Sequence, residues 1–408
     1  MNIWRISIKN IKSKPLYTFL SVFILSLSIT LLLGIQQLKT SFKYQMENNL
    51  GDIDLVIGSK GSPLQLVLAS VLHMDNPTGN ILYEEAKNIS RNPMIKTAVP
   101  ISYGDNYKGY RIVGTTDEFA TFYNAELEKG STVKKPMEVI LGHTVAEQLH
   151  LKIGDTFLSS HGLVENEVHI HSQHLKVVGI YKPTYKVIDR LIITNLESVW
   201  EVHHHEDEDK HKKEEGHMEN EEDLDAVKEI TSLLISFRNP SALLTLPRRI
   251  NEQTNMQAVL PKYELEKLSQ YTGVGIKTIS WIAYMILIIS CMTIFISLYK
   301  MVKERAFDLA LLRTYGAHNF QLIQIVAYEG IIIGMLAFMV GFLLSKAGLY
   351  FLFKIVKTEY KQNILQELPY KELLHIGGLV LIMILVAISL AIYPIIKMKI
   401  SDILSNEK

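Results

Sequence analysis

The sequence has almost no cysteine and no excess charge of either sign. Its 408 residues include one cysteine, Cys291, so no disulfide can form within the chain. The 42 basic and 42 acidic side chains balance, so the basic bias typical of nucleic-acid-binding proteins is missing. We therefore expect neither a disulfide framework nor a nucleic-acid partner.

Catalytic motifs are also missing. No G-x-x-x-x-G-K-[ST] loop for ATP occurs, and GVGIKT at 273–278 has the wrong spacing. His205-Glu206 is followed by Asp209, where a zinc peptidase motif needs its second histidine. No G-x-S-x-G nucleophile elbow is present. The sequence predicts no enzyme in this chain, so any ATP hydrolysis would belong to another chain.

Four long apolar runs are present, at Leu16–Leu38, Ile279–Leu298, Leu322–Leu344 and Leu373–Tyr393. Each approaches the roughly 20 apolar residues that a helix needs to cross a bilayer. A signal peptide is the alternative for the first run, but that run is too long and no small-residue cleavage site follows it. The sequence therefore predicts four membrane-spanning helices.

The residues before the first apolar run are basic. Arg5, Lys9 and Lys12 share one face of a helix, apolar side chains share another, and no acid occurs among the first 14 residues. This pattern is typical of a helix on an anionic membrane surface. The positive charge also predicts a cytoplasmic N-terminus.

These features predict an α-helical membrane protein with four transmembrane helices, one before and three after a large inserted α+β extracytoplasmic domain. We expect both termini in the cytoplasm, and the family resemblance described below implies the inner (plasma) membrane of a bacterial cell. Four spans with a cytoplasmic N-terminus place the 354–372 loop outside the cell. Its lysines go against the usual excess of positive charge on cytoplasmic loops. The predicted segments are a cytoplasmic amphipathic helix at 1–15, a membrane helix at 16–38, the extracytoplasmic domain at 39–275, a membrane helix at 276–299, a cytoplasmic segment at 300–321, a membrane helix at 322–346, an external loop at 347–372, a membrane helix at 373–393 and a cytoplasmic tail at 394–408.

The sequence patterns predict two subdomains in the inserted domain. Helix and strand patterns alternate over 45–115 and resume over 230–265. Short strands with turns fill 118–200, and a histidine-rich acidic loop follows at 201–225. We expect a mixed subdomain made from both ends of the insertion, with a mainly β subdomain inserted into it.

The stretch ERAFDLALLRTYGA (304–317) lies between the second and third apolar runs. Arg305 and Asp308 can pair on one helical face, Leu309 and Leu312 lie together beside them, and Gly316 is a typical helix stop. Such an amphipathic helix can be presented to a partner. An ordinary solvated connector between spans is the alternative.

The third apolar run carries small residues and one acid. Gly330 and Gly334 form a small-xxx-small pair, and Gly341 lies seven residues further on, so we predict close helix packing along one face. Glu329 is a candidate functional residue because acids are rare inside membranes. A position near the interface, or a cap on a helix contact within the bundle, is the alternative.

Nine of the 14 histidines fall between His161 and His217. Imidazoles beside carboxylates are zinc ligands, so the sequence offers a possible zinc site, with a solvated disordered loop as the alternative. The candidate ligands are His169, His171, His174, His203, His204, His205, His211 and His217.

Several motifs together resemble the permeases of FtsX/MacB-type ABC transporters. The motifs that show this resemblance are the 304–317 stretch, ILGHTVAEQLHLKIGDTF (140–157) and LKVVGIYKPTYKVIDRLIIT (175–194). The tail YPIIKMKISDIL (393–404) is similar to that family's tail but lacks its arginine cluster and Asp-Pro. DLVIGSKGSPLQLVL with DNPTGN, within 54–80, resembles one branch of such permeases.

The resemblance implies a separate ATPase subunit that binds ATP and magnesium and docks on the 304–317 stretch. The contact residues implied are Glu304, Arg305, Asp308, Leu312, Arg313, Gly316 and Ala317. A homodimer or a second permease, membrane lipid and a periplasmic protein are further expected partners. The function implied is export or extraction of a lipid, lipoprotein, peptide or metal-related substrate. A non-transporting mechanical signalling module and a zinc-handling or zinc-sensing module are the alternatives.

The histidine pattern predicts zinc binding of micromolar or tighter affinity by the 39–275 domain, since neutral imidazoles bind zinc readily. Calorimetry would measure it, with His169, His171 and His174 changed to alanine as the test of a defined site. If the domain takes up no zinc, or if the triple substitution leaves zinc uptake unchanged, the defined site is contradicted.

Overall fold

The computed structural model describes residues 3–13, 15–160, 170–202, 228–360 and 370–396 of the chain. The chain divides into two compact units. We call residues 1–42, 272–356 and 364–408 the helical unit, and residues 43–271 and 357–363 the head. The two units are treated separately below.

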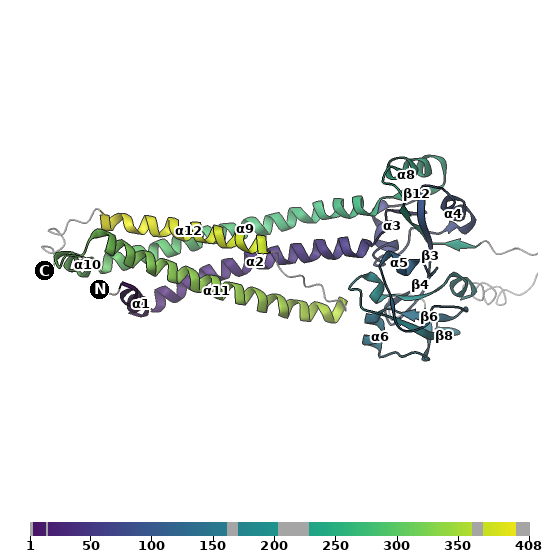
Figure 1. Cartoon of the computed structure of the whole chain (residues 1–408), viewed down its shortest axis with the longest axis horizontal. Helices are drawn as coiled ribbons and strands as arrows, with labels where there is room; N and C mark the ends of the chain where they lie inside the picture. Colours follow the sequence, from purple (N-terminus) through teal and green to yellow (C-terminus); the bar gives the residue numbers. More distant parts are fainter. Residues whose placement is uncertain (1–2, 14, 161–169, 203–227, 361–369, 397–408) are drawn as a thin grey trace, which may run out of the picture. The chain divides into compact units, whose positions relative to one another are not determined.

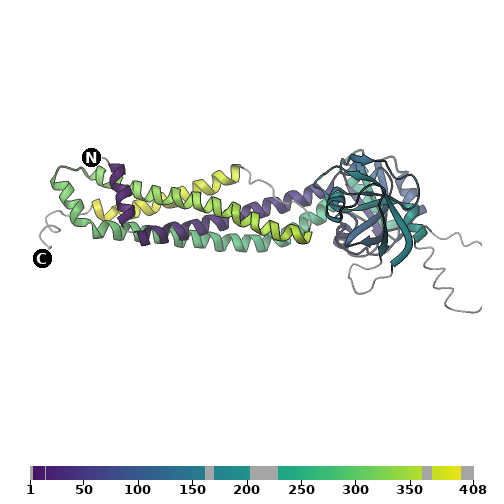
Figure 2. The ribbon, with the colours of Figure 1, turned by 90° about the horizontal axis from the view of Figure 1, so that it is seen from below.

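Among the described residues, four helices are long and apolar enough to cross a membrane, and they confirm the predicted fold class. They are α2 (Pro15–Leu50), α9 (Pro261–Glu304), α11 (Asn319–Tyr360) and α12 (Tyr370–Ile396), joined in this unit by α1 (Ile3–Ser13) and α10 (Ala306–Thr314). Figures 1 and 2 both show the four long helices side by side. Residues 43–271 of the head begin in the last turns of α2 and end in the first turns of α9.

The helices are longer than the apolar runs. Helix α2 continues to Leu50 and α9 begins at Pro261, so both ends of the predicted 39–275 domain are helical. Helix α11 continues to Tyr360, so the first part of the predicted external loop at 347–372 is helical. The apolar runs mark the part of each helix suited to lipid, whereas polar residues such as Lys354 can extend a helix into water.

Small side chains let the membrane helices approach one another. A Cβ on Gly330 would lie 2.5 Å from Cγ1 of Ile388, and one on Gly334 would meet Ile384, so these two glycines face α12. A Cβ on Gly341 would lie 2.8 Å from Cβ of Ile29, on α2. The glycine face therefore meets two different helices at different heights along α11, although seven residues change its direction by only about 20°.

The head contains a ten-stranded mixed sheet, in the order β12-β1-β11-β3-β4-β9-β6-β8-β5, with β7 paired to β3 and β8. Its strands are β1 (Leu55–Ser59), β3 (Ile95–Tyr107), β4 (Tyr110–Thr115), β5 (Leu127–Gly130), β6 (Glu138–Leu141), β7 (Thr156–Ser160), β8 (Ile170–Tyr181), β9 (Ile192–Asn195), β11 (Ser232–Phe237) and β12 (Met256–Val259). β2 (Ile81–Leu82) and β10 (Glu229–Ile230) form a separate pair. The shorter helices are α3 (Pro63–Ser70), α4 (Tyr83–Ser90), α5 (Phe119–Phe122), α6 (His143–Leu149), α8 (Ala242–Gln253) and the 3-10 helix η1 (Val187–Arg190), and residues 196–202 are helical as well.

Both faces of the first part of this sheet are covered, because alternate side chains of a strand point to opposite faces. Leu55 and Ile57 of β1 join a core with α4 and α8, while Val56 between them joins a core with α3. The 54–80 motif thus supplies a buried strand and the helix that packs on it. Its role is structural at these positions.

The remaining strands curl into a ring. Pairings run from β3 through β4, β9, β6, β8 and β7, and β7 returns to β3 at Asn106 and Ser160. The 13-residue β3 pairs with β11 and then with β4, and β4 pairs with β9, so strands from 45–115, 118–200 and 230–265 belong to one sheet.

Steric contacts explain why the 140–157 motif has glycine at position 142. Gly142 precedes α6, and its backbone N–H donates to the carbonyl oxygen of Leu191 at 2.9 Å. A Cβ there would collide with the backbone oxygens of Ile188 and Asp189. This position therefore requires glycine, since backbone atoms cannot rotate away.

Gly341→Ala is expected to destabilise the helical unit by about 1–3 kcal/mol, because the new Cβ would also lie 2.8 Å from the backbone oxygen of Ser26. Gly348→Ala in the same helix is the matched control, since nothing lies within 4 Å of its Cβ position. The control should be neutral or gain up to about 1 kcal/mol of helix propensity. Thermal unfolding in detergent measures both, and equal melting temperatures for the two variants would contradict the close α2–α11 contact.

Candidate functional site

Helix α10 is a separate short helix between α9 and α11. Arg305 is non-helical, with φ −109° and ψ 14°, and it separates α9 from α10. At the other end Gly316 has φ +95°. Its N–H donates to the carbonyl oxygen of Arg313 at 3.1 Å, and that of Ala317 donates to Leu312 at 3.0 Å. This pair of bonds is a Schellman motif, which accounts for the predicted helix stop at glycine.

The two faces of α10 differ. Leu309 and Ala310 are buried, and Leu312 packs on the same core of the helical unit. Phe307, Leu311 and Tyr315 are 37%, 40% and 82% exposed. They lie four residues apart, so they form one apolar stripe on the outer face. We call Phe307, Leu311 and Tyr315 the outer stripe.

Sequence reasoning did not single out the outer stripe. It chose Leu312 as a contact residue, whereas the structure turns Leu312 toward the bundle. The i, i+4, i+8 spacing of Phe307, Leu311 and Tyr315 was the available signal. Spacing alone shows that two apolar faces exist but not which one the bundle covers.

Arg305 is held inside the helical unit. Its Nη2 donates to Oγ of Ser13 on α1 at 2.6 Å, and its Nη1 lies 3.9 Å from the Glu329 carboxylate on α11. The predicted partner Asp308 has a side chain outside the described residues. Glu329 thus takes part in a helix contact within the bundle, which was the alternative to a free functional acid.

The other predicted contact residues are distributed over both sides of α10. Glu304 and Gly316 are exposed, while Arg313 and Ala317 are half-buried.

Helix α1 packs on α11, because Ser7 donates to the carbonyl oxygen of Ile325 at 3.2 Å and the Trp4 and Tyr328 rings lie 5.8 Å apart.

The basic face of α1 is accessible. Arg5, Lys9 and Lys12 are exposed, on the side of the helix away from the buried Ser7. A basic face of this kind remains available to anionic lipid.

Most of the predicted zinc ligands lie outside the described residues, namely His169, His203, His204, His205, His211 and His217. His171 lies on β8, but its side chain is also outside them. His174 is exposed on β8 opposite Leu158. Within the ranges that the structure describes, no three His, Cys, Asp or Glu side chains gather as a metal site would require. Zinc binding stays a prediction.

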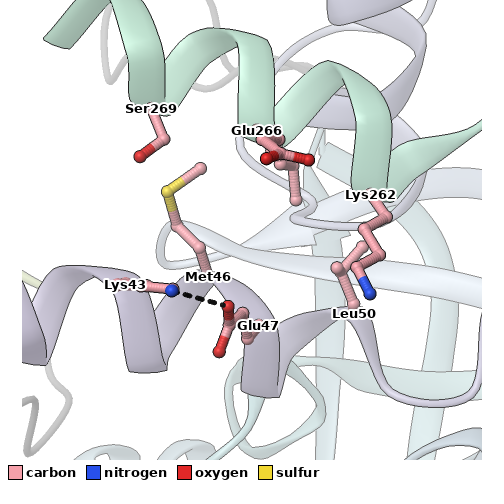
Figure 3. Close-up of a pocket in the computed structure, with 8 residues that line it drawn as sticks. Lys43, Met46, Glu47, Leu50, Lys262, Glu266 and Ser269 are labelled. Atoms are coloured by element: carbon pink, nitrogen blue, oxygen red, sulfur yellow. Dashed lines mark ion pairs between the residues drawn. The ribbon is translucent and has the colours of Figure 1, made fainter. Parts of the chain in front are cut away.

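The head has a groove of about 420 Å³ between the last turns of α2 and the first turns of α9. Figure 3 shows Met46 and Leu50 of α2 facing Glu266 and Ser269 of α9 across it. Lys43 and Glu47 form an exposed ion pair at 3.7 Å on its rim. Met46, Leu50 and Leu265 also belong to the core that contains α3, so both helices are packed into the head.

A buried histidine lies beneath α3. Nδ1 of His73 is 2.9 Å from the Tyr103 hydroxyl, which itself donates to the carbonyl oxygen of Ala69. The histidine therefore donates from Nδ1, and its buried Nε2 has no hydrogen-bond partner among the described residues. Burial, and then the positive charges of Arg111 and Arg190, lowers the pKa of His73 to about 3.

Comparison with known families gives two matches. A model described as the MacB-like periplasmic core domain matches residues 18–233, and one described as the FtsX-like permease C-terminal matches residues 280–403. The first alone spans more than half of the 408 residues. A comparison with curated protein sequences gives no match.

Two solved structures are similar to part of the chain. The periplasmic region of MacB from Actinobacillus actinomycetemcomitans matches 54% of this chain and 94% of its own, with 9% identity and a TM-score of 0.35. The extracellular domain of the noncanonic ABC-type transporter YknZ from Gram-positive bacteria matches 51% and 98%, with 12% identity and a TM-score of 0.31. The family models, rather than these low TM-scores, carry the comparison.

The neutral state of His73 predicts that acid destabilises the head. The folded pKa of about 3 lies below the unfolded value near 6.5, so the stabilisation is complete above about pH 6.5 and is lost progressively toward pH 3. The free energy of unfolding in urea, measured at about pH 7.5 and about pH 5, should fall by up to about 1.4 kcal/mol per pH unit from this group below about pH 6.5.

His73→Asn should flatten that pH dependence, because asparagine tolerates the left-handed φ of 52° and does not titrate. His174→Asn, at an exposed histidine of the same head, is the matched control and should keep the wild-type slope. Identical slopes for His73→Asn and wild type would show that another group causes the acid sensitivity.

Proposed function

The chain belongs to the FtsX-like permease family and carries a MacB-like periplasmic core domain, and from this we propose that it is the permease subunit of an ABC transporter. ATP and magnesium bind to a separate ATPase chain in this proposal, because the sequence has no phosphate-binding loop. The permease contributes no catalytic residue.

The outer stripe of α10 is the proposed docking surface for that ATPase. Phe307, Leu311 and Tyr315 are apolar and exposed, while Glu304 and Arg313 supply charge near them. An apolar centre with a polar rim is the usual composition of a protein interface. The exposure of this stripe is the single observation that carries the proposal.

Helices α2 and α9 are the proposed route from the ATPase to the head. Each is continuous in its backbone, over Pro15–Leu50 and Pro261–Glu304. Their ends pack into the head core through Met46, Leu50 and Leu265. A continuous helix transmits displacement along its axis because its backbone hydrogen bonds resist stretching. This supports mechanical coupling between ATP hydrolysis and a conformational change of the head.

The proposed orientation has both termini and α10 in the cytoplasm, with the head on the outer side of the bacterial inner (plasma) membrane. Arg5, Lys9, Lys12, Lys300 and Lys303 support it through the excess of positive charge on cytoplasmic segments. Helix α1 would then lie against anionic lipid on the inner surface. A second permease, identical or related, would complete the pathway, since four helices alone enclose little space.

The proposed substrate is a lipid, lipoprotein, peptide or metal-related compound exported or extracted at the outer side. A signalling module that regulates an extracytoplasmic protein uses the same mechanical route. The two differ in what raises ATP turnover in the reconstituted complex, which is a substrate in the first case and a protein in the second.

The double variant Phe307→Ala, Leu311→Ala should weaken binding of the ATPase partner by about tenfold or more, because two large apolar contacts are lost. Titration of the ATPase against the permease in lipid nanodiscs measures the affinity. Leu244→Ala, at an 81% exposed leucine of the head, is the control and should bind as the wild type does. Wild-type affinity of the double variant would exclude the outer stripe as the docking surface.

A further inference from the structure

A polar cluster with the buried Glu329 at its inner end and the exposed Ser13 at its outer end connects α1, the start of α10 and α11. Its members are Asn10 and Ser13 of α1, Arg305 and Glu329. Nδ2 of Asn10 donates to the Glu329 carboxylate at 2.6 Å, and Nη2 of Arg305 lies 3.4 Å from the carbonyl oxygen of Asn10. Each of the three elements therefore contacts the other two through polar groups.

The buried carboxylate of Glu329 requires both of its partners, Asn10 and Arg305. Its side chain is 3% exposed and lies within a membrane-spanning helix, so water cannot compensate a charge there. A buried carboxylate is tolerated when hydrogen bonds and an opposite charge surround it. The Asn10 amide supplies the hydrogen bond and Arg305 supplies the charge. Displacing either α1 or Arg305 would leave one of these groups buried without its partner.

Arg305 transfers this constraint to α10. Arg305 lies between α9 and α10. Its carbonyl oxygen accepts the N–H of Leu309, in the first turn of α10, at 2.9 Å. Fixing its side chain on α1 and Glu329 thus fixes where α10 begins. One residue turns a helix by about 100°, so a small change at this residue would rotate the outer stripe out of place.

We infer that Glu329 and Asn10 are positioning residues of the coupling helix, acting through Arg305, and that α1 is part of the coupling unit. This inference rests on the proposed docking of an ATPase on α10. Arg305 in this view orients the docking surface from inside the bundle and does not itself belong to the surface.

The distance between α1 and α10 tests the inference without the ATPase. Spin labels at the exposed positions Lys9→Cys and Thr314→Cys, in a Cys291→Ser background, report it by pulsed electron paramagnetic resonance of the full chain in nanodiscs. Glu329→Gln keeps the size of the side chain but removes the charge that holds Arg305. We expect the distance distribution to broaden or shift.

Ser290→Ala is the matched control, since it removes another buried polar contact of the bundle, the 2.8 Å bond to Ser28, without touching α10. It should lower the melting temperature about as much as Glu329→Gln but leave the distance distribution as in the wild type. An unchanged distribution in Glu329→Gln, or equal broadening in both variants, would overturn the inference.

Coupling is measured separately, as the increase in ATP turnover when the ATPase binds the permease. Glu329→Gln should reduce that increase about fivefold or more, the size of a typical coupling free energy, while Ser290→Ala should not. Arg305→Lys keeps the charge beside Glu329 but loses the guanidinium contacts to α1, so it gives the same test if Glu329→Gln folds poorly. Full coupling in both Glu329→Gln and Arg305→Lys would overturn the inference.

Failure of the proposed function has a different signature. In that case the Phe307→Ala, Leu311→Ala variant binds the ATPase normally, yet the label distances still respond to Glu329→Gln. The distance measurement and the docking measurement therefore separate the two conclusions.

Discussion

A backbone that crosses lipid must satisfy its own hydrogen bonds, and only helices or closed barrels do so. The chain meets this constraint with four long helices, and two of them, α2 and α9, continue without a break into residues of the head. The same hydrogen bonds that make a span stable in lipid make it stiff along its axis. The proposed function uses this axial stiffness as its mechanical element.

The parts of the head share one sheet. The long strand β3 pairs with β11 and β4, and β4 pairs with β9, so strands from both predicted subdomains are joined by backbone hydrogen bonds. The ends of α2 and α9 join a core that extends through α3 to Val99 of β3 and Ile193 of β9. The groove between the two helix ends leaves room for side chains to move, while Leu50 and Leu265 remain in that core.

Local patterns predicted much of this fold, and contacts distant in sequence account for the rest. Apolar runs predicted the four spans, and Gly316 predicted the end of α10. The end of α11 at Tyr360, the ring closed by β7 and the different partners of Gly334 and Gly341 depend on which elements meet in space. The same holds at the candidate site, where Leu312 and Leu311 are adjacent and chemically identical, and only the packed bundle decides which one stays exposed.

Helix α10 has nine residues, too few to remain helical in water through its own hydrogen bonds. Its order comes from Leu309 and Ala310 against the bundle and from the glycine stop at its end. A chain whose spans had not yet come together would therefore have no folded surface to offer an ATPase. In the proposed function, assembly in the membrane would therefore precede docking of the ATPase, and its ATP hydrolysis would not be coupled to an immature permease.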